Sequence, residues 1–264
     1  MGDIPIEWIV VLFIAAFAAG WVDAVSGGGG LIQLPLLLLA LPTSMVVSAL
    51  GTNKVSSMIG TSAAAATYVR RSPPDPRTAL PMALAAFIGS GIGALTATRV
   101  PPELFRPIVA VVLLVVWVWT LVRPQMGDTD RLRWEGRQRH YVTAVALGFA
   151  IGCYDGLVGP GTGAFLVFVL VWVLGYSFLR SSATAKVVNL GTNIAAVIVF
   201  GLSGHVLWAL GLLMGVGNLV GGITGARMAV ARGSGFVRLV LLIVVGVLIV
   251  VLLVQSLLPL LTAE

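Results

Sequence analysis

The chain has 264 residues, of which 58% are hydrophobic and only 10% are charged, and its formal net charge is +6. A soluble domain cannot bury so much apolar surface, so the composition predicts an integral membrane protein. The positive charge is mostly arginine in short loops, which is typical of membrane proteins and argues against nucleic-acid binding. The chain has a single cysteine, Cys153, which excludes an internal disulfide. Its two histidines lie far apart in the sequence, so we expect no metal site, and we expect no cofactor.

Hydrophobic segments alternate with polar loops along the whole chain, and we expect five segments in each half. They cover residues 5–24, 30–41, 43–69, 78–98 and 104–122, and then 141–158, 162–175, 178–201, 205–226 and 237–258. A full span needs roughly 20 residues, so the second segment of each half is too short for a comfortable crossing. It forms either a re-entrant hairpin with the first segment or a short tilted span.

The second half of the chain repeats the first without gaps, at the offset that separates Asp23 from Asp155. At this offset Lys54 also aligns with Lys186. Matched charges are rare by chance in so apolar a sequence, so two structural repeats are expected. The predicted division is residues 1–122 for the first repeat, 123–140 for a linker loop and 141–264 for the second repeat.

Most arginines lie in four loops, at residues 70–77, 123–140, 176–182 and 227–238. The positive-inside rule puts these loops, including the linker, in the cytoplasm and both termini outside. Equivalent loops of the two repeats then face opposite sides, as in the inverted repeats of secondary transporters, whose binding site lies near the midplane. We therefore expect an all-α integral protein of the cell (inner) membrane, with two inverted-topology repeats and broken or re-entrant glycine-rich segments at midplane.

Four charged residues lie inside the apolar segments: Asp23, Lys54, Asp155 and Lys186. A charge at the bilayer centre costs on the order of 3 kcal/mol, so each of them needs a reason. A structural interpretation pairs Asp23 with Lys54 and Asp155 with Lys186. A functional interpretation uses the lysines to bind an anion and the aspartates for proton coupling or for holding the glycine breaks open.

The stretches SGGGGL (26–31) and GPGTGA (159–164) let the chain unwind within the membrane, and each precedes a new helical segment. The N-terminus of such a segment attracts an anion. Ser26 and Thr162 add hydroxyl donors. Further polar side chains near the lysines, Thr52, Asn53, Asn189 and Asn193, either line a cavity or bond across helices. Rows of small residues, Gly89/Gly93 and Gly217/Gly221/Gly225, predict close helix packing.

The sequence resembles a known protein family in both of its halves. GWVDAVSGGGGLIQLPLL (20–37) and ALGTNKVSSMIG (49–60) resemble the first half of the sulfite exporter TauE/SafE family, also called the 4-toluene sulfonate uptake permease family. GCYDGLVGPGTGAFL (152–166) and SSATAKVVNLGTNIAAVIVF (181–200) resemble its second half. The resemblance covers essentially the whole chain and implies a bacterial or archaeal inner-membrane carrier for sulfite, sulfoacetate or other organosulfonates.

By position, the resemblance carries the family's polar motif onto Lys54, Thr52, Lys186, Thr184 and Asn189, and onto glycines 27–30 and 159–163. The first glycine run lacks the hydroxyl that Thr162 supplies in the second, so the two halves of the site are not expected to be equivalent. The full set of expected substrate-binding residues is Lys54, Lys186, Thr52, Asn53, Thr184, Asn189, Ser26, Gly28, Gly29, Gly30, Gly161, Thr162 and Gly163.

We therefore expect a carrier, not an enzyme, that moves a small sulfur-containing anion by alternating access, with export as the expected direction. Its expected partners are the anion and the lipid bilayer, and the sequence is compatible with a homodimer. Three alternatives stay open. The first is a transporter of a metal cation or neutral metabolite that uses Asp23 and Asp155. The second is a passive anion channel, and the third a membrane enzyme.

Overall fold

The computed structural model describes residues 5–97, 118, 122, 127–134 and 136–261, and this described part consists of helices and turns without a strand. The helices, in chain order, are α1 (Ile6–Ser26), α2 (Gly30–Ala40), α3 (Val46–Arg71), α4 (Pro76–Thr96), α6 (Gln138–Leu157), α7 (Thr162–Val169), α8 (Phe178–Leu202) and α9 (Trp208–Leu261). A 3₁₀ turn, Thr43–Met45, precedes α3, and a π-helical turn, Leu170–Leu174, continues α7.

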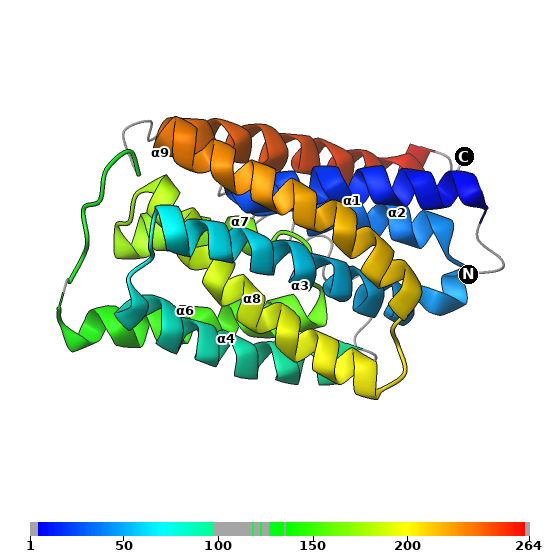
Figure 1. Ribbon diagram of the computed structural model, residues 1–264, viewed down its shortest axis with the longest axis horizontal. Helices are drawn as coiled ribbons and strands as arrows, with labels where there is room; N and C mark the ends of the chain where they lie inside the picture. Colours follow the sequence, from blue (N-terminus) through cyan, green and yellow to red (C-terminus); the bar gives the residue numbers. More distant parts are fainter. Residues whose placement is uncertain (1–4, 98–117, 119–121, 123–126, 135, 262–264) are drawn as a thin grey trace.

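The all-helical prediction is therefore confirmed, and the predicted segments match these helices to within a few residues. Segment 104–122 lies almost wholly outside the described residues. The last two segments, 205–226 and 237–258, are the two arms of α9, which turns back at Gly233 (φ 74°, ψ −168°). In Figure 1 the first arm runs from right to left and the second returns to the right. Only glycine adopts these backbone angles without strain, which explains where the turn occurs.

The two short helices fold back as hairpins. In Figure 1, α1 runs from the right-hand end to the middle of the molecule, and α2 returns toward the right. At the opposite end, α6 begins near the linker. The chain after α7 returns to the linker, where the amide of Arg131 donates to the carbonyl of Gly175 (2.7 Å). The 11 residues of α2 reach only about 16 Å, roughly half the hydrocarbon thickness of a bilayer. The re-entrant alternative thus fits better than a short crossing.

The long helices pack in reciprocal pairs, α4 against α6 and α1 against α9, with α3 and α8 between them (Figure 1). Glycines let the backbones touch: a Cβ on Gly89 would lie 2.4 Å from the Phe149 carbonyl oxygen, and one on Gly221 would lie 2.1 Å from that of Phe17. These two contacts are repeat counterparts of each other. The predicted packing role of the small-residue rows is confirmed at these positions.

The exterior of the bundle is apolar. Leu84 and Leu95 of α4, for example, are each 64% exposed. Soluble proteins rarely expose large continuous apolar surfaces to water. Four helices of the described chain, α1, α4, α8 and residues 208–247 of α9, are long and apolar enough to cross a membrane. The protein is a multi-pass membrane protein.

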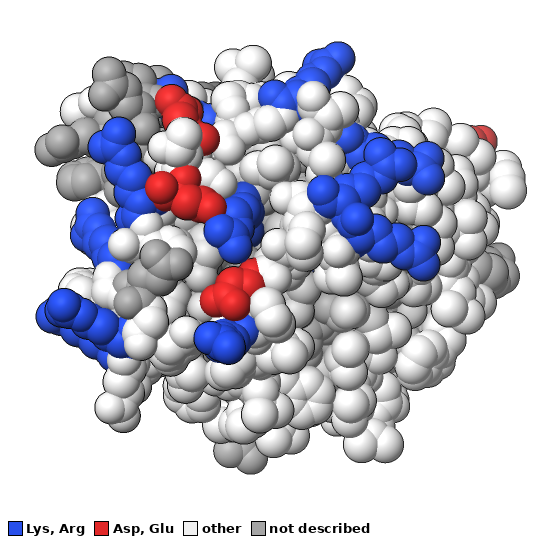
Figure 2. Space-filling view, turned by 60° about the vertical axis from the view of Figure 1, so that its left-hand side comes forward, with Lys and Arg blue, Asp and Glu red and all other residues white. Residues whose placement is uncertain are grey.

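Basic side chains gather at one end of the bundle, on the face that Figure 2 brings forward. This end is where α3 meets α4, where α6 and α8 begin, and where α9 turns back (Figure 1). The described arginines in these regions are Arg70, Arg71, Arg77, Arg131, Arg133, Arg137, Arg139, Arg180, Arg227, Arg232 and Arg238. The arginine-rich loops of the sequence therefore share one end of the molecule, as their common orientation requires.

Candidate functional site

Both hairpins break at glycines whose backbone other residues rarely adopt. Gly27 and Gly28 follow α1 with φ of 77° and 116°, and Gly159 and Gly161 follow α6 with φ of 87° and 86°. The breaks meet at the centre of the molecule: a Cβ on Gly27 would lie 2.1 Å from the carbonyl carbon of Gly163. The two glycine runs thus form one junction between the halves of the chain.

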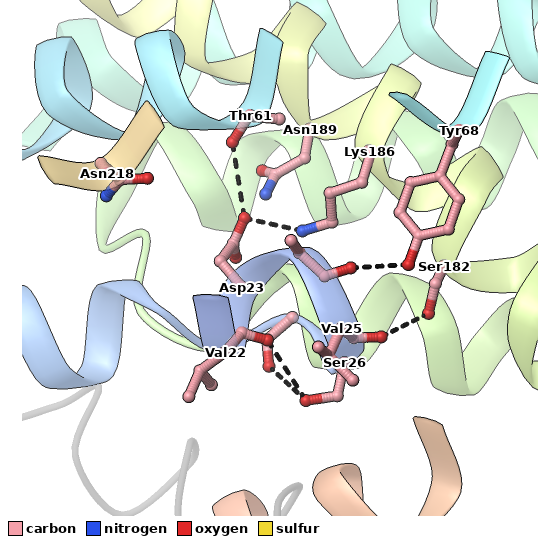
Figure 3. A network of polar contacts seen from close by, with 12 residues as sticks. Val22, Asp23, Val25, Ser26, Thr61, Tyr68, Ser182, Lys186, Asn189 and Asn218 are labelled. Atoms are coloured by element: carbon pink, nitrogen blue, oxygen red, sulfur yellow. Dashed lines mark hydrogen bonds and ion pairs between the residues drawn. The ribbon is translucent and has the colours of Figure 1, made fainter. Parts of the chain in front are cut away.

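Side chains from other helices satisfy carbonyl groups that the first break frees. The Tyr68 hydroxyl donates to the Ala24 carbonyl (2.8 Å), and the Ser182 hydroxyl donates to that of Val25 (2.9 Å), as Figure 3 shows. At the second break the Tyr154 hydroxyl donates to the Pro160 carbonyl (2.6 Å). The sequence did not predict these hydrogen bonds, because a tyrosine or serine in an apolar helix does not reveal a distant backbone partner.

The four intramembrane charges form two ion pairs, and each pair joins the two halves of the chain. The Lys186 ammonium donates a 2.7 Å hydrogen bond to Asp23 Oδ2 (Figure 3), and Lys54 Nζ lies 2.7 Å from Asp155 Oδ2. The predicted pairing of Asp23 with Lys54 and of Asp155 with Lys186 is wrong. Because the breaks interlock at the junction, each aspartate faces the lysine helix of the other half.

A small polar cavity of about 20 Å³ lies at this junction. Glycine backbone and polar or charged side chains line it, without a large apolar side chain. The lining residues are Asp23, Gly28, Gly30, Asn53, Lys54, Ser57, Asp155, Gly159, Gly161, Thr162, Gly163, Asn189 and Asn193. Most of the residues expected from the sequence are thus brought together, with both aspartates among them.

Three lining residues were outside the expected set: Ser57, Gly159 and Asn193. Ser57 lies one turn beyond Asn53 on α3, so its position on the same helix face was the available signal. Asn193 was expected either to line a cavity or to bond across helices, and it lines the cavity.

Five expected residues do not line the cavity. The Thr52 hydroxyl donates to the Ser48 carbonyl (2.6 Å) and accepts from the Leu207 amide (3.0 Å), so it fastens the α8–α9 connection to α3. The Ser26 hydroxyl contacts only carbonyls of its own turn, at 3.5 Å. The other three are packed in protein: Gly29 against the backbone of α1, and Thr184 and Lys186 inside the bundle.

Several buried polar atoms of the lining have no hydrogen-bond partner among the residues that the structure describes. They are Asn53 Oδ1, Asp155 Oδ2 and Asn193 Nδ2. Lys54 is close to Asp155, but the angles between them do not suit a hydrogen bond. Unpartnered buried polar groups cost free energy, and a polar ligand or water in this cavity would satisfy them.

The N-termini of α2 and α7 open at the same junction. Neither helix has a side-chain cap: the N-cap residues are Gly29 and Gly161, which have no side chain to accept a hydrogen bond. The Thr162 hydroxyl donates to the Gly159 carbonyl (2.8 Å), so toward the cavity its oxygen is an acceptor. Among the described residues, the amides of Gly30 and Gly163 have no acceptor, whereas those of Leu31 and Ile32 donate to the carbonyls of Gly28 and Gly29. The free amides of a first helical turn favour negative charge.

Comparison with known proteins agrees with this architecture. The family model of the sulfite exporter TauE/SafE family matches residues 12–252. The chain belongs to the sulfite exporter TauE/SafE family.

Relatives in this family match the chain over most of its length. The probable membrane transporter protein ORF9 of Sinorhizobium sp is 38% identical, over 92% of this chain and 92% of its own. The probable membrane transporter protein of Haemophilus influenzae is 33% identical, over 89% and 91%. YfcA of Escherichia coli K12, another probable membrane transporter protein, is 33% identical over 90% and 87%. No solved structure matches the chain. As a TauE/SafE family member with apolar spanning helices, the protein is a membrane transporter.

Proposed function

We propose that this transporter is a carrier for a small sulfur-containing anion, such as sulfite or an organosulfonate, and that it exports the anion by alternating access. The observation that carries the proposal is the polar cavity at the junction of the two glycine breaks. There Lys54 and the uncapped N-termini of α2 and α7 converge on one small space.

An oxyanion matches this lining in three ways. Its charge is attracted to the Lys54 ammonium, and its oxygens accept from the first-turn amides that the helices leave free at the cavity, those of Gly30 on α2 and Gly163 on α7. Asn193 Nδ2, which has no partner within the described part of the chain, is a further donor.

Alternating access requires two bodies that move against each other around the site, and inverted repeats supply them. The reciprocal contacts of the fold support such repeats. Asp23–Lys186 has its counterpart in Asp155–Lys54, and the α1–α9 contacts have theirs in α6–α4. The hairpins α1–α2 and α6–α7 also open toward opposite ends of the molecule, which supports opposite topologies for the two halves.

Ligand-induced thermal stabilisation of the purified protein tests the substrate class, because a ligand that binds the native state raises its melting temperature. The ligands are sulfite, sulfate, sulfoacetate, methanesulfonate and taurine. We expect stabilisation by sulfite or a sulfonate in the wild type. The double variant Lys54→Gln/Asp155→Asn removes the cavity's positive charge without leaving a buried carboxylate unpaired, and we expect it to lose that stabilisation. Stabilisation that persists in the double variant would contradict the proposed anion site.

Transport in liposomes then distinguishes a carrier from a passive channel. A carrier shows saturable uptake and counterflow: unlabelled anion inside the vesicle accelerates entry of labelled anion. A linear dependence of flux on concentration, without counterflow, would favour the channel.

A metal cation is the second candidate substrate, because two carboxylates, Asp23 and Asp155, line the same cavity. The stabilisation assay includes divalent cations for this reason. Stabilisation by a cation but by no anion, lost in Asp23→Asn and Asp155→Asn, would favour a cation transporter. Since each carboxylate has a lysine as a close neighbour, we expect the anion result.

A further inference from the structure

The two ion pairs are repeat counterparts, but their surroundings differ. On Asp23, Oδ2 accepts a hydrogen bond from Lys186 (2.7 Å) and a longer one from the Thr61 hydroxyl (3.4 Å), as Figure 3 shows. Lys186 is fully buried and does not reach the cavity. This carboxylate therefore has two donors, and its lysine is shielded from any ligand in the cavity.

In the second pair both members line the cavity, although their side chains are only 5% and 2% exposed, against 16% for Asp23. Both Lys54 and Asp155 line the space, and Asp155 Oδ2 accepts no hydrogen bond although Lys54 Nζ is 2.7 Å away. The repeat counterpart of Thr61 is Asn193, whose Nδ2 has no partner. The hydrogen bond that Thr61 donates to Asp23 thus has no counterpart at Asp155 among the described residues.

Charge balance then decides what an incoming anion does. Binding to Lys54 competes with Asp155, whose side chain is 2% exposed. A buried carboxylate that loses its cation costs several kcal/mol, unless it takes up a proton. The other charges at the cavity are Asp23 from α1 and, behind it, Lys186 from α8. They already compensate each other and cannot stabilise Asp155.

We propose that Lys54–Asp155 is the exchangeable pair of the transporter: each anion that binds at Lys54 places one proton on Asp155, while Asp23–Lys186 stays ion-paired. The carboxylate of Asp155 gains a proton from the bulk solution, supplied by the buffer, and the Lys54 ammonium changes its partner from that carboxylate to the anion. The net charge of the site does not change when the anion is monovalent. Asp23 and Lys186 are positioning residues that hold the first break. This inference rests on the proposed anion transport.

Proton uptake on ligand binding tests the inference directly. Methanesulfonate is the first probe, because it stays ionised at all relevant pH values and contributes no proton of its own. Calorimetric titration in two buffers of different ionisation enthalpy gives the number of protons bound per anion. For the wild type we expect about one proton per anion, and an affinity that falls about tenfold per pH unit where free Asp155 is ionised.

The repeat counterparts give matched variants. In Asp155→Asn the binding of methanesulfonate should take up no proton and should not depend on pH. In Asp23→Asn/Lys186→Gln, which neutralises the other pair as a unit, proton uptake should remain about one per anion, whatever the affinity.

The outcomes separate this inference from the proposed function. Anion binding by the wild type without proton uptake would overturn the inference alone. So would proton uptake that persists in Asp155→Asn or that disappears in Asp23→Asn/Lys186→Gln. If Asp155→Asn does not fold, the proton count of the wild type and of the other variant still decides. If neither methanesulfonate nor sulfite binds to the wild type, the proposed function fails, and the inference fails with it.

Discussion

Gly27 illustrates how a missing side chain lets the two halves of the site meet. Its φ of 77° and ψ of 151° lie outside the range of other residues, and a Cβ there would lie 2.1 Å from the backbone of Gly163. Strained angles of this kind cost about 1–3 kcal/mol in a residue with a side chain. The overlap adds to that cost because the contact is with backbone, which cannot rotate away.

We therefore expect Gly27→Ala to destabilise the protein by at least about 2 kcal/mol and to abolish stabilisation by the substrate. Gly91→Ala on α4 is the control, because a Cβ at Gly91 meets nothing within 4 Å. Alanine also favours a helix over glycine by about 1 kcal/mol, so this variant should be as stable as the wild type or slightly more stable. Thermal unfolding of the purified variants measures both effects. Equal stability of Gly27→Ala and the wild type would show that the breaks do not pack against each other.

The sequence predicts the polar residues of the site well, because a charge or a run of glycines in an apolar segment is costly and therefore conspicuous. It does not predict how they pair. The repeat gives Asp23 two chemically identical candidates, Lys54 and Lys186, and only the crossing of the breaks selects Lys186. Thr52 was assigned to the site with its neighbour Asn53. Successive residues on a helix point about 100° apart, so Thr52 faces the α8–α9 connection instead.

At the scale of helices, the glycine contacts between α4 and α6 and between α1 and α9 are repeat counterparts. Helix bounds are predictable from hydropathy because each segment is long and apolar. Whether α1 and α2 form a hairpin is not, because segment length allows both alternatives and the packing of the breaks decides between them. The packing of the long helices makes a prediction about two distant glycines, Gly89 on α4 and Gly221 on α9.

Gly89→Ala and Gly221→Ala should destabilise the protein by similar amounts, about 1–3 kcal/mol each. In both, the new Cβ would lie within 2.4 Å of a carbonyl oxygen on the facing helix, that of Phe149 or Phe17. Their effects should add in the double variant, because the two contacts join different helix pairs. Thermal unfolding of the single and double variants tests this, with Gly91→Ala again as the control. A loss confined to one of the two would contradict the reciprocal packing.

The linker contributes a contact that depends on pH. Asp130 accepts from the Arg180 guanidinium (2.6 Å) and from the Ser177 amide (2.7 Å), just before α8. Partial burial raises the pKa of Asp130, but the hydrogen bonds from Arg180 and Ser177 outweigh that effect and hold this pKa below its usual value. A lowered pKa in the folded state means that the stabilisation is present above the unfolded-state pKa and is lost as pH falls through the folded one.

Asp130→Asn should therefore lower the free energy of unfolding near neutral pH by no more than about 1 kcal/mol, because the ion pair is partly exposed. The melting temperature should fall slightly as a result. The difference from the wild type should shrink as the pH falls below about 4 and Asp130 of the wild type becomes protonated. Melting temperatures of both proteins across this range measure the effect. A difference that does not change with pH would show that the ionised carboxylate is not what stabilises the linker.

At the scale of the whole molecule, charge is distributed along the long axis. The described arginines gather at the end that Figure 2 faces, whereas the opposite end, with the α8–α9 turn around Ser203, has none among the described residues (Figure 1). An excess of arginine marks the cytoplasmic side of a membrane protein. From this asymmetry we predict that the start of α1 and the end of α9, which share the arginine-poor end, lie outside the cell.

Cysteine accessibility tests this orientation, and the chain is suited to it because Cys153 is its one cysteine. In a Cys153→Ala background, Ser203→Cys and Thr129→Cys introduce exposed thiols at opposite ends of the molecule. A membrane-impermeant maleimide added to intact cells should label Ser203→Cys and should label Thr129→Cys only after the membrane is permeabilised. The reverse pattern would put the arginines outside and would invert the expected direction of every transport step. Labelling of both sites in intact cells would mean that the protein inserts in both orientations, as an inverted-repeat carrier with a weak charge bias would do. The arginine excess at one end argues against that outcome.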